Sequence, residues 1–322
     1  MTFKDELWEA FEQMMSYRTA TGYATATYRS SVPPFMDYCT SHYTNATVIT
    51  QEMVDGWLAS YPYSTNSQAA FISLLREYTK YLNFLGRGDF IPDDDYSIKR
   101  IAFNPYIFTD DDLNRLFATI DCYTASTSGK RLLPEMVLPV YSRFLFCCGM
   151  RPQEPPALLC KDVNLSTGDV YIRQSKQHKD RHIIVSNDML ELCVSYDTLA
   201  GDRHWFFQKW DGGPYTTSWY TQIWRKLWKM AVPMRRGMPR PYDLRHAFAS
   251  RNIIRWLEAG KDVMELLQYL SAYMGHSKLE STLYYISMLP EKLRKSAKID
   301  WKKLSAIYGE EDSEDENQSK GS

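Results

Sequence analysis

The feature that most constrains the fold is the break at residues 86–97, where the sequence GRGDFIPDDDYS separates two long regions of helical pattern. Glycine and proline interrupt regular structure, and three consecutive aspartates favour solvent, so this stretch is typical of a linker. A chain of 322 residues is long enough to bury two separate cores. The sequence therefore predicts two domains, residues 1–86 and 105–308, joined by a linker over 87–104.

The first domain is predicted to be helical. The stretch SQAAFISLLREYTKYLNFLG carries apolar residues at helical spacing and ends at Gly86, where a C-terminal cap belongs. Similar patterns predict three more helices, near residues 4–18, 25–42 and 50–60. The pair Pro33–Pro34 should disturb the second of these, because proline lacks the amide N–H that a helix interior requires.

The second domain changes pattern along its length. An apolar helical pattern covers 131–150, and helical patterns return after residue 215 and continue to about 307. Between them, residues 162–186 are rich in valine, isoleucine and tyrosine and contain two turn signals, which predict a small antiparallel sheet of about three strands. The fold class is therefore mainly α with a small antiparallel β-sheet (α+β).

Three aspartates, Asp110 to Asp112, follow Thr109 at the start of this domain. They are candidate metal ligands, but three consecutive residues face different directions on a helix. Threonine is a good N-cap, and carboxylates in the first turn interact favourably with the helix dipole. Helix capping is the favoured interpretation.

Composition excludes several classes of protein. No apolar run reaches the roughly 18 residues that span a bilayer, and the first residues are acidic where a signal peptide would be basic. We therefore expect a cytoplasmic protein with no membrane contact. The six cysteines show no C-x-x-C spacing, which argues against a disulfide framework or a zinc site.

The formal net charge of −1 hides an uneven distribution. Residues 1–100 carry −4, residues 101–308 carry +8, and the tail 309–322 carries −5. A basic central region suits a polyanion such as nucleic acid. The tail has no apolar residues and is predicted to be disordered.

The stretch GHSKLESTLYYIS raises a specific chemical possibility, because His276 precedes two adjacent tyrosines, Tyr284 and Tyr285. A tyrosine that attacks a phosphodiester needs help to lose its proton, since its pKa is normally near 10. Charge on the phosphate oxygens calls for arginines, and the departing oxygen needs a proton donor such as lysine. Either tyrosine could instead be a packing residue.

The basic region supplies one candidate for each role. A pair of arginines could bind phosphate, a lysine lies at the tip of the predicted hairpin, and two further polar residues stand three positions from the arginines. Each of these residues also has an ordinary interpretation, as a surface, salt-bridge or turn residue. The candidates are Arg151, Glu154, Lys176, Tyr242, Arg245 and His276.

The order of five motifs, GMRPQE, SKQHKDR, YDLRHAF, YMGHS and STLYYIS, resembles the tyrosine recombinase (phage integrase) family, in particular integrases of mobile elements. The resemblance covers about residues 105–290. Residues 1–86 are similar in general pattern to the helical core-binding domain of this family. The resemblance implies a two-domain architecture, in which that domain and a mixed catalytic domain both contact DNA.

The resemblance also assigns roles to the candidates. It implies that Arg151 and Arg245 bind the scissile phosphate and that Glu154 supports the first arginine. Lys176 matches the hairpin lysine that protonates the leaving oxygen, and His276 matches a histidine that bonds the phosphate or assists the nucleophile.

The family usually places its tyrosine nine residues after this histidine, which selects Tyr285 as nucleophile and leaves Tyr284 as a packing residue. Tyr242 stands where the family usually has another histidine. A phenol still donates a hydrogen bond to phosphate but is a poor base, so a catalytic role for Tyr242 stays open.

The implied function is site-specific DNA recombination through a 3′-phosphotyrosyl intermediate, for integration or excision of a mobile element. The implied partners are double-stranded DNA with specific sites, three further copies of the chain in a tetramer on paired sites, and accessory DNA-bending or directionality proteins. No cofactor and no metal are expected. The alternatives are a type IB topoisomerase-like nicking–rejoining enzyme and a non-catalytic DNA-binding protein of the same fold.

Residues 289–307 alternate apolar and basic side chains and predict one or two short amphipathic helices. They could fold back on their own domain. The family resemblance implies instead that they dock on a neighbouring protomer.

Overall fold

The computed structural model describes residues 2–60, 64–92, 104–123, 133–173, 180–232, 237–276 and 278–287. The chain divides into two compact units, Met1–Asn104 and Pro105–Ser322. Lys176, most of the predicted linker and everything after residue 287 lie outside the described residues. None of the described helices combines the length and the hydropathy needed to cross a bilayer.

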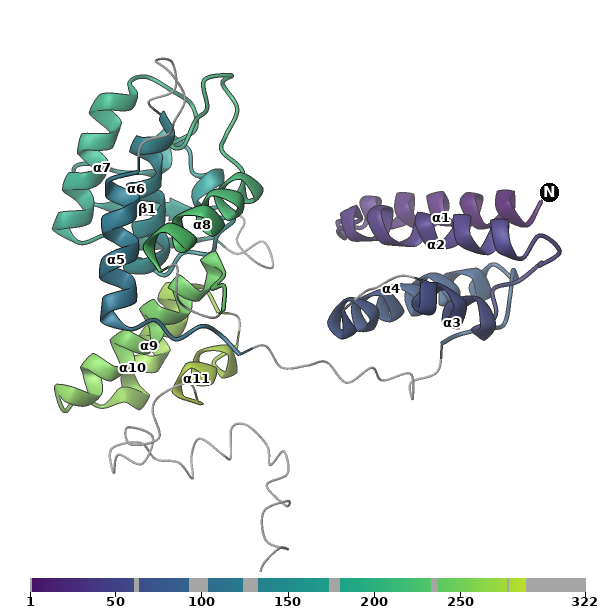
Figure 1. Cartoon of the computed structure of the whole chain (residues 1–322). Helices are drawn as coiled ribbons and strands as arrows, with labels where there is room; N and C mark the ends of the chain where they lie inside the picture. Colours follow the sequence, from purple (N-terminus) through teal and green to yellow (C-terminus); the bar gives the residue numbers. More distant parts are fainter. Residues whose placement is uncertain are drawn as a thin grey trace, which may run out of the picture. The chain divides into compact units, whose positions relative to one another are not determined.

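The described part of the first unit is helical, as predicted (Figure 1). Its helices are α1 (Phe3–Ala20), α2 (Ala26–His42), α3 (Gln51–Ser60) and α4 (Thr65–Phe84). Their apolar faces form one core that includes Phe11, Phe35 and Trp57. The buried hydroxyl of Tyr78 on α4 donates to the carbonyl of Leu7 on α1 at 2.7 Å, which fixes these two helices to each other.

The end of α4 confirms Gly86 as a cap. Gly86 has φ 70°, its N–H donates to the Asn83 carbonyl, and the Arg87 N–H donates to the Leu82 carbonyl. These two bonds are a Schellman motif, which favours glycine at the left-handed position.

The expected disturbance of α2 is not found, because this helix runs unbroken through Pro33 and Pro34. The neighbouring residues Val32, Phe35 and Met36 are fully buried. Burial of this apolar face outweighs the two backbone hydrogen bonds that the prolines remove.

The second unit contains seven described α-helices, two short 3-10 helices and one described sheet. The helices are α5 (Asp110–Asp121), α6 (Leu133–Cys147), α7 (Asn187–Ala200), α8 (Thr217–Ala231), α9 (Pro241–Glu258), α10 (Val263–Met274) and α11 (Glu280–Ser287). The larger core mixes aliphatic and aromatic side chains, and within it the ring centroids of Tyr141 and Tyr220 stack 4.1 Å apart. The unit is mainly helical, as predicted.

Capping of α5 confirms the interpretation of the aspartates. Thr109 Oγ1 accepts from the Asp112 N–H at 3.1 Å, and the Asp112 carboxylate accepts from the Thr109 N–H at 3.0 Å. This reciprocal pair is a capping box.

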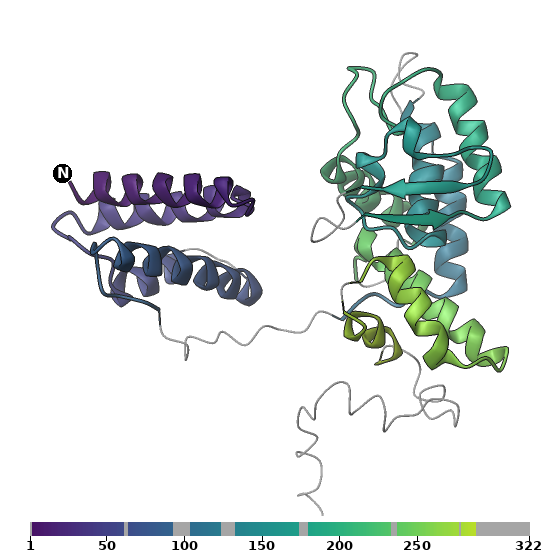
Figure 2. The ribbon, with the colours of Figure 1, turned by 180° about the vertical axis from the view of Figure 1, so that it is seen from behind.

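The sheet consists of two antiparallel strands, β1 (Asp169–Ile172) and β2 (Arg181–Ile184), which lie side by side in Figure 2. The expected third strand is reduced, within the described residues, to a single bridge between Val163 and Val170. A short 3-10 helix ends just before Val163, and the Asn164 side chain accepts N–H bonds from the two residues that follow Leu165. These turns leave no run of extended backbone long enough for a strand.

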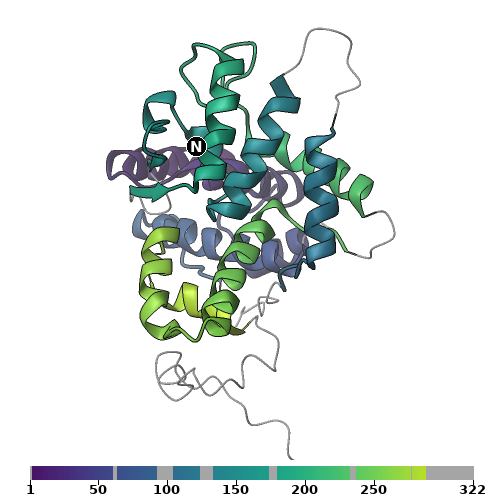
Figure 3. The same ribbon diagram turned by 90° about the vertical axis from the view of Figure 1, so that its left-hand side faces the viewer.

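The last three described helices, α9, α10 and α11, gather at one end of the unit (Figures 1 and 3). Their facing side chains form a separate small core that includes Ile253, Leu267 and Leu283. This packing brings the first turn of α9, the residues after α10 and all of α11 close to the loop that follows α6.

Candidate active site

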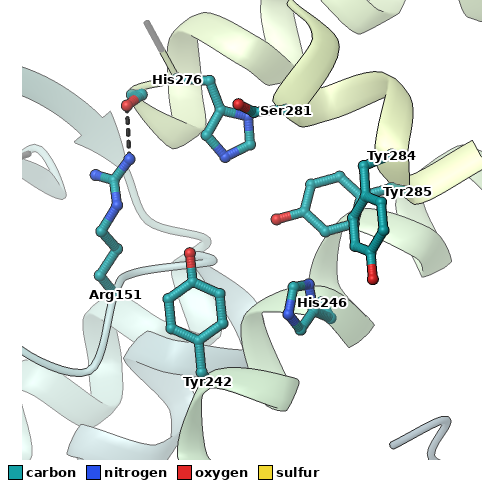
Figure 4. A pocket seen from close by; sticks show the side chains of 8 residues that line it. Arg151, Tyr242, His246, His276, Ser281, Tyr284 and Tyr285 are labelled. Atoms are coloured by element: carbon teal, nitrogen blue, oxygen red, sulfur yellow. Dashed lines mark hydrogen bonds between the residues drawn. The ribbon is translucent and has the colours of Figure 1, made fainter. Parts of the chain in front are cut away.

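A pocket of ≈ 310 Å³ lies where these segments meet. Four separate parts of the sequence supply its lining, and Figure 4 shows the labelled side chains around one common space. The lining residues are Arg151, Tyr242, His246, Gly275, His276, Ser281, Tyr284 and Tyr285. Of the predicted site residues, only Lys176 lies outside the described part of the chain; Glu154 and Arg245 are buried behind the pocket wall.

Arg151 enters the pocket from the loop after α6. This loop turns at Gly149, which has φ 60° and where a Cβ would lie only 2.4 Å from Phe248 Cδ1. The guanidinium of Arg151 donates to Glu154 Oε1 at 2.9 Å. It also donates to the Gly275 carbonyl at 2.7 Å, the dashed line in Figure 4. The backbone N–H of Arg151 donates to the other oxygen of Glu154 at 2.7 Å.

Arg181 also holds Glu154, although sequence reasoning did not single it out. It is the first residue of β2, and its two terminal nitrogens donate to the two carboxylate oxygens of Glu154, both at 2.7 Å. Burial raises the pKa of Glu154, but the hydrogen bonds and charge of Arg181 and the Arg151 backbone N–H outweigh it and lower the pKa to about 2. Glu154 is therefore ionised at neutral pH.

Arg245 is fully buried on α9. Its guanidinium donates to the carbonyls of Gly149 and Met274, the latter at 2.7 Å, and one nitrogen lies 2.9 Å from His276 Nε2. Its Nε has no hydrogen-bond partner among the residues that the structure describes. Burial lowers the pKa of Arg245, but an arginine keeps its proton in proteins.

His276 is held in one orientation by both ring nitrogens. Arg245 can only donate, so Nε2 of His276 is an acceptor, and Nδ1 donates to Thr282 Oγ1 at 2.7 Å. The backbone directs the ring here because Gly275 has φ 67° and ends α10, with the His276 N–H donating to the Ser271 carbonyl. The tautomer follows from these contacts.

Gly275→Ala should destabilise the second unit by more than the backbone conformation alone requires. A Cβ at Gly275 would lie 2.9 Å from Arg181 Cδ, and the guanidinium next to this carbon is fixed by bonds to Glu154 and to the Tyr273 carbonyl. Gly86→Ala is the matched control, because Gly86 has φ +70° and nothing within 4 Å of the added carbon.

We expect a loss of about 1–2 kcal/mol in unfolding free energy for Gly86→Ala, and a clearly larger loss for Gly275→Ala. Urea titrations of the two variants measure this difference. Equal losses would mean that Arg181 moves aside without resistance.

The two tyrosines differ in environment. Tyr285 is 2% exposed, and its ring centroid lies 5.9 Å from that of His276 at 25° between planes. Burial raises the pKa of Tyr285 to about 12, while the positive charges of Arg245 and Arg151 act in the opposite direction. Tyr284 is 38% exposed and also lines the pocket, and its ring centroid lies 6.3 Å from that of His246 and 6.2 Å from that of Tyr285, so its role as a packing residue stays a prediction.

His246 is a second residue that the sequence did not identify. Its ring centroid lies 5.0 Å from Tyr242 and 5.5 Å from Tyr285. Burial, helped by the charges of Arg240 and Arg245, lowers the pKa of His246 to about 4, so the ring is neutral at pH 7. Its Nδ1 has no hydrogen-bond partner within the described residues.

This neutral histidine predicts acid sensitivity of the second unit. Below pH 6.5 His246 is protonated in the unfolded chain, whereas in the folded chain it stays neutral until the pH approaches 4. The contribution of His246 to the unfolding free energy is therefore present above pH 6.5 and is lost as the pH falls toward 4. The shift corresponds to about 3 kcal/mol. Urea titrations at several pH values should show a smaller loss for His246→Gln than for the wild type over this window, and parallel losses would contradict the prediction.

The site combines positive charge with a buried phenol. Arg151 and Arg245 carry charges that could stabilise an anion in the pocket, and the ring of His276, whose Nε2 accepts from Arg245, stacks beside the ring of Tyr285. Among the described residues, no group of three or more histidines, cysteines, aspartates or glutamates is arranged to hold a metal ion.

A family model described as "Phage integrase family" matches residues 107–292, more than half of the chain. The chain is 25% identical over 204 residues to the putative integrase/recombinase y4rB of Sinorhizobium fredii, a match that covers 60% of this chain and 64% of that protein. It is 24% identical over 294 residues to the putative integrase/recombinase y4rE of the same organism, covering 87% of this chain and 91% of that protein.

Among solved structures, the chain is similar to a lambda integrase tetramer bound to a Holliday junction. The TM-score is 0.62 at 14% sequence identity, and the match covers 86% of this chain and 78% of that chain. At this identity the likeness shows the fold alone. It confirms the predicted fold class, a mainly helical chain with a small antiparallel sheet.

Proposed function

The chain belongs to the phage integrase family, and we propose that it is a site-specific DNA recombinase that cuts and rejoins strands through a covalent link between Tyr285 and a 3′ phosphate. The observation that carries the proposal is the meeting of Arg151, His276 and Tyr285 at one pocket, with Arg245 behind its wall and bonded to His276. The four residues belong to four different segments: the loop after α6, helix α9, the residues after α10, and α11. These groups supply the nucleophile, a proton acceptor and the charge stabilisation that phosphoryl transfer from DNA to a phenol requires.

The proposed cleavage step begins with attack by the Tyr285 hydroxyl oxygen on the scissile phosphorus. The bond from phosphorus to the 5′ oxygen breaks, and the charge that develops on the non-bridging oxygens is stabilised by the two arginines. The leaving oxygen takes a proton from Lys176. Attack by a 5′ hydroxyl on the phosphotyrosine reverses these steps, so the bond energy is retained and no nucleotide cofactor is needed.

The proton of Tyr285 also needs an acceptor, because a pKa of about 12 keeps it on the oxygen at neutral pH. We propose His276 Nε2, the acceptor nitrogen of a ring that lies beside the phenol. A protonated Nε2 could no longer accept from Arg245. That N–H of Arg245 would then turn to the phosphate as its negative charge grows, which couples proton transfer to charge stabilisation.

The proposed substrate is double-stranded DNA with specific recombination sites. The similarity to a lambda integrase tetramer on a Holliday junction supports assembly as a tetramer on paired sites. We propose integration or excision of a mobile element as the purpose; the two Sinorhizobium relatives, both described as putative integrase/recombinases, support the recombinase role. We propose that this takes place in the cytoplasm, with accessory DNA-bending or directionality proteins.

A nicked suicide substrate tests the proposal. The full chain is incubated with duplex DNA whose cleaved end diffuses away, and the trapped adduct is digested and mapped by mass spectrometry. We expect a 3′-phosphotyrosyl peptide that contains Tyr285. Sequence-specific binding without an adduct would support a non-catalytic DNA-binding protein, and an adduct that relaxes plasmids but never joins two sites would support a topoisomerase-like enzyme.

Lys176→Ala should slow cleavage of ordinary DNA, because the 5′ oxygen then leaves without a proton. A substrate with sulfur in place of that oxygen has a better leaving group and needs no proton donor, so it should largely restore the rate. Arg151→Ala is the control, since sulfur does not replace charge stabilisation. Equal rescue of both variants would remove the general-acid role from Lys176.

A further inference from the structure

A buried cluster of three charges stands directly behind Arg151. Glu154 binds Arg151 through Oε1 at 2.9 Å and binds Arg181 through both oxygens at 2.7 Å. The side chains of Arg151, Glu154 and Arg181 are only 5%, 3% and 8% exposed. Solvent therefore screens these charges weakly, and each strongly affects its neighbours.

Glu154 alone would weaken the charge of Arg151. A buried carboxylate in contact with a guanidinium forms a neutral pair, which attracts an incoming phosphate far less than a lone guanidinium does. Arg181 changes this balance, because two arginines and one carboxylate have a net charge of +1. Its forked contact with Glu154 also draws the carboxylate toward β2.

Arg181 also fixes the geometry on the other side of the pocket. Its Nε donates to the Tyr273 carbonyl at 2.9 Å, in the last turn of α10. Arg151 donates to the Gly275 carbonyl, two residues further along the same segment, and His276 is the next residue. One side chain thus connects β2, Glu154 and the end of the helix that presents His276.

We infer that Arg181 is a positioning residue for strand cleavage. Arg181 offsets the charge of Glu154 and so keeps the positive charge of Arg151 available to the scissile phosphate. The inference rests on the function proposed above. Arg181 does not line the pocket, and it acts through Glu154 and Arg151.

Cleavage of two substrates by Arg181→Gln tests the inference. We expect this variant to cleave ordinary DNA about 10- to 100-fold more slowly, the range typical when a residue that orients a directly acting group is replaced. On DNA with a neutral methylphosphonate at the scissile position, the deficit should shrink to a few-fold, because less charge needs to be stabilised. A deficit of the same size on both substrates would show a merely structural role and overturn the inference.

The double variant Glu154→Gln/Arg181→Gln separates charge from packing. If Arg181 acts by offsetting Glu154, removal of the carboxylate should make the double variant faster than Arg181→Gln alone. A double variant that is as slow or slower would also overturn the inference. Arg143→Gln is the matched control, since Arg143 makes a forked pair with Asp121 at 2.7 and 2.8 Å outside the pocket and should cleave as the wild type does.

Binding provides a measurement that needs no cleavage. In a Tyr285→Phe background, affinity is compared for DNA with a charged and with a neutral scissile phosphate. Arg181→Gln should reduce the preference for the charged form, and an unchanged preference would count against the inference. If the wild type forms no adduct at all, the proposed function fails. The preference for a charged over a neutral scissile phosphate then still reports whether Arg181 keeps the pocket positive. Arg181→Lys, which retains the charge but not the fork, should keep most of the preference if it folds as the wild type does.

Discussion

Tyr285→Phe is expected to bind its DNA site normally and to form no covalent adduct. The change removes only the hydroxyl oxygen, and phenylalanine fills the space of a side chain that is 2% exposed. Loss of the nucleophile should reduce adduct formation below detection, the largest effect of any substitution considered. Suicide-substrate trapping measures the adduct, and gel-shift titrations measure binding.

Tyr284→Phe is the matched control and should still form the adduct. The comparison is stringent because both tyrosines line the pocket and the rings lie 6.2 Å apart. Exposure alone would favour Tyr284, which is 38% exposed. We favour Tyr285 because its phenol interacts with the charges of Arg245 and Arg151 and its ring stacks beside His276. A phosphopeptide mapped to Tyr284 would reverse the assignment.

Much of this site could be predicted from the sequence because its polar residues occur in short motifs whose order matches a known family. The motifs identified Arg151, Glu154, Arg245 and His276, and the structure brings all four within a small volume. Local rules were also reliable at helix ends. The caps at Thr109 and Gly86 depend only on neighbouring backbone groups.

Arg181 and His246 were missed for a physical reason. Arg181 is the last residue of the SKQHKDR motif, but its role depends on contacts with Glu154 and Tyr273, which are 27 and 92 positions away in the sequence. His246 follows Arg245 directly, and only the packing of α11 against α9 makes it a neighbour of Tyr285. Side chains that act through buried tertiary contacts leave no periodic signal in a sequence.

The failed expectations have the same origin. A pattern of β-branched residues predicted a third strand, but the backbone N–H groups of Ser166 and Thr167 donate to the Asn164 side chain in a turn. The disturbance expected at Pro33 was overridden by burial of Phe35 and its neighbours. In both places a contact that the pattern does not contain decided the outcome.

The structure also explains why the site is so closely packed. Gly149 and Gly275 each adopt positive φ and each lack room for a side chain, against Phe248 and Arg181 respectively. The backbone therefore approaches closely enough for its carbonyls to accept from Arg245 and Arg151. Both arginines are held by the backbone of the segments that must meet, so the fold and the site depend on the same hydrogen bonds.

Arg245→Lys is therefore expected to impair both cleavage and stability. Loss of one preorganised donor typically slows catalysis about 100- to 1,000-fold, and a lysine cannot reach the Gly149 carbonyl, the Met274 carbonyl and His276 together from one nitrogen. Buried carbonyls left without a donor should also lower the unfolding free energy by about 1–3 kcal/mol each.

Single-turnover cleavage and urea titrations measure the two effects of Arg245→Lys separately. The matched control is Arg143→Lys, because Arg143 also makes three hydrogen bonds, two to Asp121 and one to the Pro139 carbonyl, on the surface of the same unit. Its side chain is 26% exposed, so its replacement should change stability little and cleavage not at all. If Arg245→Lys cleaves at the wild-type rate in a folded chain, Arg245 serves only to join Gly149 to the end of α10, and the phosphate must be held by other groups.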